Sequence, residues 1–419
     1  MKKNILNLSL LACLATPLAA HAAPPAFVTT GANDGKGSLR AALASGASKI
    51  IITRKVKYIG ITEPLVYQET APLTLIGKGQ TIFGHDGDGP ILHVADGANL
   101  SVKHLDFAGP GGFDIEHPGG GKGIFVEVPD DREGLVHVQL KNVSVSGTGN
   151  HGIHVSDCSL GDECGDGQGE DEGTGSDASI FMQLNRVTVD GVGFGKQDAD
   201  GVRIDDRGEG DIIFNATNST FKDVGADGVE LDEGGNGSVI INVRKSVFKR
   251  NGAYCFDIDG DGPFDPIAID PNCNDDGDPD VDDAFDIDEA GPGGIMGMVA
   301  NVKAIDNFDE GLDFDTEGDE GDNFVDLDLI NIRAKGNADE GIKVSEEGNA
   351  SVVVNMRAIK AGGDIEVEEE GDGDLQVSIK GSKIGDDLKL SESDDGVGTV
   401  KLRGTKVVDE KDFNNVDEI

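Results

Sequence analysis

The chain has 419 residues, of which 37% are hydrophobic and 62 are glycine. Trp is absent and only 5% of the residues are aromatic, which excludes a core built on large rings. The 79 acidic and 35 basic residues give a formal charge of −44, which argues against a nucleic-acid partner because phosphate binding needs a basic surface. No apolar run reaches the roughly 18 residues of a membrane helix, so we expect no transmembrane segment.

The first 22 residues have the pattern of a secretory signal. Two lysines precede an apolar stretch at 5–20, and Ala20-His21-Ala22 is a small-x-small cleavage site. We therefore expect cleavage after residue 22 and a secreted or periplasmic protein. In an alternative interpretation, Cys13 is a lipidated N-terminus.

A short repeat of glycine followed by alternating apolar residues determines the predicted fold. Its leading apolar positions are 27 residues apart at Val202, Val229 and Phe256, and 30 apart at Leu312 and Ile342. Each unit would hold two or three short strands with alternating burial, separated by Gly, Asp and Asn turns. Such units, stacked one on the next, form a parallel β-solenoid.

Stacking would bring equivalent side chains of the repeat into columns about 4.8 Å apart. One outer column is mostly acidic: Ser156, Asp205, Asp232, Asp259, Asp315, Ser345, Glu368 and Ser391. A second column, in the following strands, is basic: Lys141, Arg244, Lys303, Arg357, Lys380 and Arg403. Two interpretations of the basic column stay open, a solvated surface that blunts sheet edges and a track for a polyanion.

Residues 37–43 (GSLRAAL) and 72–82 (PLTLIGKGQTI) resemble the capping segment and first full coil of the pectate-lyase-like superfamily. This resemblance implies an all-β fold, a secreted right-handed parallel β-helix with an N-terminal cap. We expect a single domain over 23–412 after the signal at 1–22, and a short tail at 413–419. Two acidic loops, at about 158–178 and 257–292, would be insertions in the stack.

The longer insertion has the composition of a calcium site. It holds 14 acidic residues between Asp257 and Glu289, many of them alternating along glycine turns, and such turns direct several oxygens at one hard cation. The spacing departs from an EF-hand at Ala268 and resembles more closely the Asp-rich loops of thrombospondin type 3 repeats. The predicted Ca²⁺ ligands are Asp257, Asp259, Asp261, Asp265, Asp276, Asp278, Asp280 and Asp282. The alternative is a disordered acidic loop.

Four cysteines follow the signal, which is an even number in a chain expected to be exported. Their positions favour two local disulfides, Cys158–Cys164 and Cys255–Cys273. Free or differently paired thiols are the alternative.

Evidence for catalysis is weaker. Arg203 with Asp205, Asp206 and Asp232 could supply the base and cation of a polysaccharide lyase, or the paired carboxylates of a glycoside hydrolase. The motifs of those enzymes are absent, however, and acid pairs recur on nearly every coil. His151 and His154, three residues apart on one strand, are expected to face opposite sides as surface residues.

These observations predict a secreted, calcium-stabilised β-helix protein, a monomer that binds a polysaccharide or a cell-surface ligand without defined catalysis. The alternative is a polysaccharide-degrading enzyme, a lyase or hydrolase acting on an acidic glycan.

Overall fold

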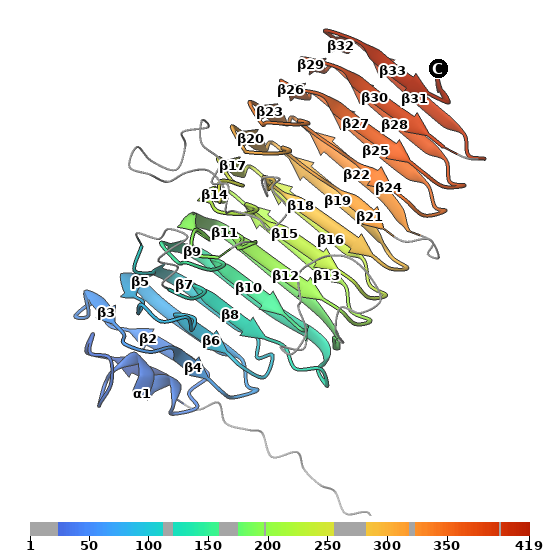
Figure 1. Cartoon of the computed structure of the whole chain (residues 1–419). Helices are drawn as coiled ribbons and strands as arrows, with labels where there is room; N and C mark the ends of the chain where they lie inside the picture. Colours follow the sequence, from blue (N-terminus) through green and yellow to red (C-terminus); the bar gives the residue numbers. More distant parts are fainter. Residues whose placement is uncertain are drawn as a thin grey trace, which may run out of the picture.

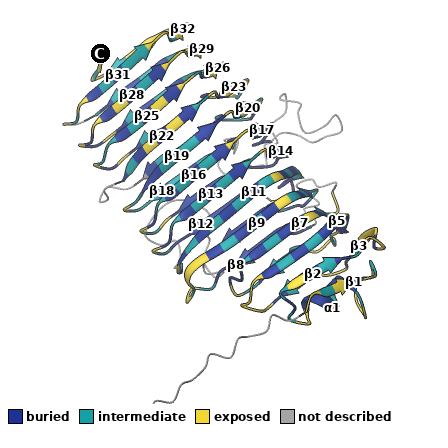
Figure 2. Cartoon of the chain, turned by 180° about the vertical axis from the view of Figure 1, so that it is seen from behind, coloured by how far each residue is buried: buried dark blue, intermediate teal, exposed yellow. Residues whose placement is uncertain are grey.

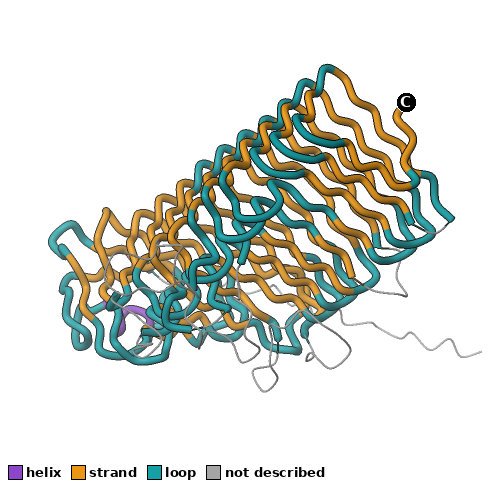
Figure 3. The backbone as a smooth tube through the Cα atoms, turned by 45° about the horizontal axis from the view of Figure 1, so that its top comes forward, coloured by secondary structure: helices purple, strands orange, loops and turns teal. Residues whose placement is uncertain are grey.

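The computed structural model describes residues 24–111, 120–158, 175–196, 198–254, 282–317, 323–393 and 395–419. Its strands form a right-handed parallel β-helix whose coils follow one another along a single axis (Figure 1). The predicted all-β fold is thus confirmed. The tube in Figure 3 shows the coils lying one above another. The predicted signal at 1–22 lies outside the described residues.

The described chain forms three parallel sheets, of which the largest runs the length of the stack and the third continues the second at the C-terminal end. The largest contains β1 (Ala26–Val28), β2 (Lys49–Ile52), β3 (Tyr58–Gly60), β5 (Leu73–Phe83), β7 (Leu100–Ala108), β9 (Glu133–Ser146), β11 (Asp177–Val192), β13 (Ile212–Thr217), β14 (Thr220–Val224), β16 (Val239–Arg244), β17 (Val247–Lys249), β19 (Gly294–Ala300), β20 (Lys303–Ile305), β22 (Phe324–Ile330), β23 (Arg333–Lys335), β25 (Val352–Arg357), β26 (Lys360–Ala361), β28 (Leu375–Lys380), β29 (Lys383–Ile384), β31 (Gly398–Arg403), β32 (Lys406–Val407) and β34 (Val416–Glu418). The second contains β4 (Leu65–Tyr67), β6 (Leu92–Val94), β8 (Ile124–Glu127), β10 (Ile153–Ser156), β12 (Val202–Asp206), β15 (Glu230–Glu233), β18 (Asp286–Ala290), β21 (Asp315–Glu317) and β24 (Ser345–Glu346). The third contains β27 (Ile365–Glu369), β30 (Leu388–Glu392) and β33 (Lys411–Asn414).

Period-2 alternation places the apolar side chains inside the coils. Along β28, Leu375, Val377 and Ile379 are buried, whereas Gln376 and Lys380 are exposed. Figure 2 shows this alternation of buried and exposed residues on strand after strand. The inward side chains form one continuous hydrophobic core through the stack.

A short helix, α1 (Leu39–Leu43), lies at the N-terminal end of the stack, as the resemblance implied for residues 37–43. The Ser38 hydroxyl caps it by accepting a hydrogen bond from the backbone N–H of Ala41 at 3.1 Å. Leu39 and Leu43 are buried against the first strands. Among the described residues no helix is long and apolar enough to cross a bilayer.

The stacking register corrects part of the predicted repeat. Arg203 pairs with Glu230, as a 27-residue step requires, but Leu231 then pairs with Ile287 and not with Ile258. The sequence FDID occurs at both 256–259 and 285–288, and regular spacing alone selected the first copy. The place predicted for Asp259 therefore belongs to Asp288.

Three predicted boundaries also differ from the boundaries in the structure. Strand β18 lies inside the range 257–292 that was predicted as an insertion, and β11 begins inside the range 158–178. The predicted tail at 413–419 continues the stack through β34, which pairs with β31. In the basic column, Ala300 takes the place predicted for Lys303, because Val243 pairs with Val299.

A tight corner separates the two strands that each coil contributes to the largest sheet. The corner residue adopts a positive φ in successive coils, for example Asn142 at 50°, Asn218 at 54° and Asn331 at 53°. Asn tolerates this left-handed conformation better than most residues, which explains the Asn and Gly at the turns of the repeat.

The stack also contains an unpredicted column of buried acids where the strands of the second and third sheets end. The members pair in register and lie on the core side of their strands: Asp206, Glu233, Glu289, Thr316, Glu346, Glu369 and Glu392. None exceeds 1% exposure. We call this set the internal acid column.

Asp206, Glu233, Glu346 and Glu369 of the internal acid column are each held by the turn that follows, whereas neither carboxyl oxygen of Glu289 has a donor among the described residues. Glu233 accepts from the N–H of Gly235 at 3.0 Å, and Glu346 accepts from that of Gly348 at 2.8 Å. The second carboxyl oxygen of each has no donor among the described residues. Burial, followed by repulsion from Glu233, raises the pKa of Glu289 to about 9.

The internal acid column should make stability depend on pH. Burial also raises the pKa of Glu233 to about 8. Because these folded-state pKa values lie above the ordinary value of 4.5, the stabilisation is fully present below that value and is lost as pH rises toward 9. The free energy of unfolding, and with it the melting temperature, should therefore fall from pH 5 to pH 9. Glu289→Gln should reduce the fall in the free energy of unfolding by an amount on the order of a few kcal/mol.

The exposed Glu370 supplies the matched control, since Glu370→Gln removes the same charge from the surface. Thermal melts of the three proteins at several pH values make the comparison. Identical pH profiles for wild type and Glu289→Gln would contradict the assignment.

Candidate functional site

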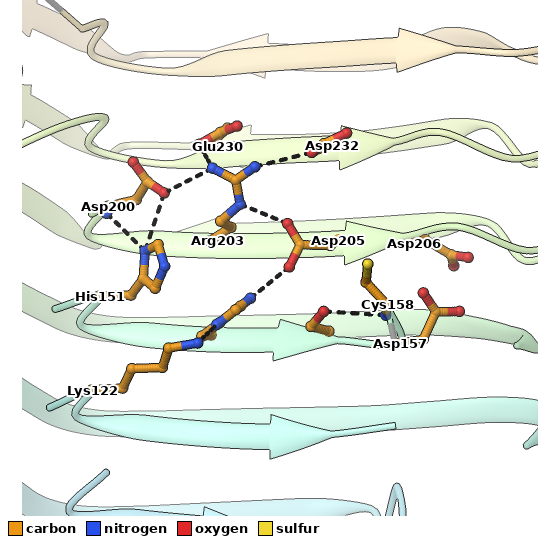
Figure 4. Close-up of polar contacts among 12 residues, drawn as sticks. Lys122, His151, Asp157, Cys158, Asp200, Arg203, Asp205, Asp206, Glu230 and Asp232 are labelled. Carbon is orange, nitrogen blue, oxygen red and sulfur yellow. Dashed lines mark hydrogen bonds and ion pairs between the residues drawn. The ribbon is translucent and has the colours of Figure 1, made fainter. Parts of the chain in front are cut away.

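Three of the four residues predicted for catalysis, Arg203, Asp205 and Asp232, lie on the outer face of the second sheet, in a cluster that extends across β8, β10, β12 and β15. Phe125, His154, Arg203 and Glu230 occupy one register position on these four strands. The next outward register position, two residues further along the strands, is occupied by Ser156, Asp205 and Asp232. Figure 4 shows how Arg203, Asp205, Glu230 and Asp232 converge.

Arg203 lies at the centre of this cluster and is only 2% exposed. Its Nε donates to Asp205 Oδ1 at 2.6 Å, and its terminal nitrogens donate to Glu230 Oε2 at 2.5 Å and Asp232 Oδ2 at 3.0 Å (Figure 4). Burial alone would lower the pKa of Arg203, but Glu230 and Asp205 outweigh it and raise that pKa. The guanidinium is therefore a permanent positive charge shared among carboxylates of two coils.

His154 connects this cluster to the neighbouring coil. Lys122 donates a hydrogen bond to Nδ1 of His154, so the ring proton is on Nε2. This Nε2–H donates to Asp205 Oδ2 at 2.5 Å. Burial, reinforced by the nearby ammonium of Lys122, lowers the pKa of His154 to about 4. Burial also lowers the pKa of Lys122 to about 8. The imidazole is therefore neutral at pH 7, with its tautomer fixed by Lys122 on one side and Asp205 on the other.

The predicted placement of the two histidines on opposite surfaces is wrong. The rings of His151 and His154 lie 4.6 Å apart, and the residues are 4% and 7% exposed. His151 precedes β10 and belongs to the turn, where strand alternation does not apply. Its Nδ1 accepts from the backbone N–H of Asp200 at 2.9 Å.

Of the four predicted catalytic candidates, Arg203, Asp205 and Asp232 lie together, but Asp206 belongs to the internal acid column beside Asp157 (Figure 4). Alternation along β12 explains this, because adjacent residues of a strand face opposite sides. Sequence reasoning missed Arg207, whose terminal nitrogens bind both carboxylate oxygens of Asp232, at 2.8 and 2.5 Å.

The cluster is saturated as well as buried. Asp205 uses one oxygen for Arg203 and the other for His154, and both oxygens of Asp232 are bound by arginines. Burial would raise the pKa of Asp205, yet Arg203 and His154 hold it well below its usual range. A sugar could reach the Asp205 carboxylate only by displacing one of these partners, so the geometry is that of a charge network that joins coils.

On the coils that follow Arg203, acidic side chains gather on the same face in groups that could hold a cation. Oxygens within 4.8 Å of one another come from Glu230, Asp286 and Asp288, and from Asp283, Asp286 and Asp313. Burial, followed by repulsion from Asp288, raises the pKa of Asp286 well above its ordinary value. We call Glu230, Asp283, Asp286, Asp288 and Asp313 the outer acid ladder.

The calcium ligands predicted from the sequence lie in the insertion between β17 and β18. Seven of them, Asp257, Asp259, Asp261, Asp265, Asp276, Asp278 and Asp280, lie outside the described residues. Asp282, the eighth predicted ligand, is the first described residue after this gap. Of the four cysteines, Cys158 is described and buried, whereas Cys164, Cys255 and Cys273 are not described. Both disulfides and the insertion's calcium site stay predictions.

A separate hollow of about 290 Å³ lies on the outer face of the largest sheet. Amide side chains from successive coils line it: Gln139, Gln183, Asn185, Asn215 and Asn242. Gln139 donates to Gln183 across one coil step at 2.7 Å, while the buried Oδ1 of Asn242 has no donor in the described part of the chain. We call this hollow the amide groove. It combines donors and acceptors in a row along the stack.

Removing Arg203 tests the charge network. Arg203→Gln leaves Asp205, Asp232 and Glu230 without their shared cation, and breaking a buried pair in this way costs roughly 3–5 kcal/mol. Arg203→Lys should recover only part of that loss, because a compact ammonium cannot span carboxylates on two coils. Arg333→Gln, at an exposed position, should leave stability unchanged in the same urea unfolding experiment. Equal stability of Arg203→Gln and wild type would rule out the network.

No family model and no curated protein sequence matches this chain. Among solved structures it is similar to ORF18 of Geobacillus virus E2, at 10% identity and a TM-score of 0.45, and to tailspike protein 3 of bacteriophage CBA120, at 12% identity and a TM-score of 0.40. Each comparison covers 93% of this chain and 61% of the other, so the chain spans about three fifths of their length.

Proposed function

We propose that this protein is a secreted, calcium-stabilised β-helix that binds a polysaccharide along the outer face of its largest sheet. The observation that carries the proposal is the amide groove. Side-chain amides offer a donor and an acceptor on one plane, which suits neighbouring hydroxyls of a sugar. Their repetition from coil to coil suits a ligand that itself repeats.

Catalysis at Arg203 is not part of this proposal. A general base needs a lone pair within reach of the substrate, and both oxygens of Asp205 already accept hydrogen bonds inside a nearly closed cluster. A polysaccharide lyase or hydrolase acting on an acidic glycan remains the second candidate function. Nothing in the network specifically favours it over binding.

Calcium enters the proposal through electrostatics. Carboxylates stacked in register repel, and the outer acid ladder brings five of them together, of which Glu230 is paired with Arg203 and Asp313 with Lys343. Ca²⁺ prefers oxygen ligands in flexible sets of six to eight, which such a ladder can supply together with backbone carbonyls and water. Residues that would hold the ion are Asp283, Asp286 and Asp313, with Glu230 one coil step away and Asp288 on the same strand as Asp286.

Calcium should raise the melting temperature. An ion that binds only the native state adds roughly 2.7 kcal/mol at a hundredfold excess over Kd, and extracellular calcium modules bind at about 0.1–1 mM. Asp286→Asn with Asp313→Asn should remove most of the calcium-dependent rise. A parallel variant with Asp259, Asp261, Asp278 and Asp280 changed to Asn measures how much of the calcium-dependent rise in melting temperature comes from the insertion. Equal melting temperatures of wild type in excess chelator and in millimolar calcium would refute calcium stabilisation.

Glycan binding should depend on the amide groove. Gln183→Ala with Asn215→Ala removes two amides that line it, so retention on immobilised neutral and acidic polysaccharides should weaken. The matched control is Gln376→Ala, an exposed amide on β28 outside the groove. Affinity electrophoresis in gels that contain each polysaccharide provides the measurement. A panel of polysaccharides that retards neither wild type nor variants would overturn the proposed function.

A further inference from the structure

Eight basic side chains in the C-terminal coils form two columns on either side of the tight corner. Arg357, Lys380 and Arg403 stack in register just before it. Just after it, a second column stacks in register: Lys303, Arg333, Lys360, Lys383 and Lys406. All eight are exposed. We call them the basic stripe.

Lys343, Lys389 and Lys411 of these coils form ion pairs with carboxylates, whereas the bases of the basic stripe form none among the described residues. Lys343 lies 2.9 Å from Asp313 and 3.0 Å from Asp315, and Lys389 contacts Glu340 at 2.6 Å. In the part of the chain that the structure describes, no member of the basic stripe forms an ion pair with a carboxylate. In a protein with a formal charge of −44, eight unpaired cations are gathered at one corner.

Edge protection and solubility do not account for the basic stripe. Charged residues blunt sheet edges where a strand lacks a neighbour, but β23, β26 and β29 have parallel partners on both sides. The large net charge already supplies solubility. Like charges directly opposite one another on neighbouring strands destabilise a sheet, so the arrangement is costly without an anionic partner.

We propose that the basic stripe binds an acidic polysaccharide that carries one carboxylate on each sugar. Its charges repeat at the coil spacing of about 4.8 Å, which is close to the advance of one sugar ring in an extended chain. Phosphates of duplex DNA repeat every 3.4 Å along a strand and would lose register within a few coils. Single-stranded nucleic acid requires stacking aromatics, and the basic stripe has none.

The site continues the proposed glycan-binding face and rests on that proposed function. The column of Arg357, Lys380 and Arg403 is an extension of the register position that holds Asn185 in the amide groove. Toward the middle of the sheet, Asn355 and Ser378 form a neutral border. Five stacked positions span about 19 Å, the length of four or five sugars.

Oligogalacturonates of defined length provide the probe, in chelator so that calcium cannot bridge the ligand to the acidic face. Lys360→Gln, Lys383→Gln and Lys406→Gln together should weaken their binding roughly tenfold in isothermal titration. The control variant, with Lys36, Lys49 and Lys55 changed to Gln, removes the same charge from exposed positions at the other end of the stack and should bind like wild type. Raising the salt concentration should reduce the difference between the two variants.

Loss of binding by the groove variant with full binding by the stripe variant would overturn this inference while leaving the proposed function standing. Equal stripe-dependent binding of duplex DNA would replace the polysaccharide with a generic polyanion and would also overturn it. Self-association that the stripe variant abolishes would identify a second copy as the partner, with the same consequence.

Discussion

In-register parallel stacking of coils is the constraint on which this structure depends. It places the same side chain about 4.8 Å above its equivalent, coil after coil, so every choice of residue is repeated along the stack. Apolar choices build a continuous core at little cost. Charged choices create columns of like charge, and each such column must be neutralised.

The protein neutralises its acidic columns in different ways. Arg203 and Arg207 are inserted among Asp205, Asp232 and Glu230, so cations alternate with carboxylates across coils. Lys343 and Lys389 do the same nearer the C-terminus. The internal acid column holds no cation among its members, and burial raises the pKa of its carboxyl groups, that of Glu289 to about 9. In the outer acid ladder Arg203 pairs with Glu230 and Lys343 with Asp313, and the proposed calcium ion would neutralise the carboxylates between them.

The sequence predicted the parts of this architecture that depend on regular spacing. Coil length and inward apolar residues follow from periodicity, and the end helix was implied by the resemblance of residues 37–43 to a capping segment. Regular spacing selected the wrong copy of FDID, because only the first continues the 27-residue step, and the pairing of Leu231 with Ile287 identifies the second. His151 was misplaced because strand alternation was extended into a turn.

The internal acid column had a sequence signal that was not used. Acid-x-Gly-x-Gly follows the strand at Glu233, Glu289 and Glu369, a turn in which glycine amides can hold a buried carboxylate. The closed state of the Arg203 cluster had no such signal, because saturation depends on contacts between coils. Charge networks join the coils on the outer face of the second sheet. The basic stripe, at the corner of the largest sheet, is exposed to a ligand.

Carbon-13 NMR titration of the side-chain carboxyl groups of glutamate tests most directly whether stacking forces the buried acids to keep their protons. Spectra of wild type and Glu289→Gln identify the signal of Glu289. The account predicts that this carboxyl is still protonated at pH 7, with a pKa of about 9. A midpoint near the ordinary pKa of 4.5 would show that the internal acid column is ionised in the native protein and would contradict the account.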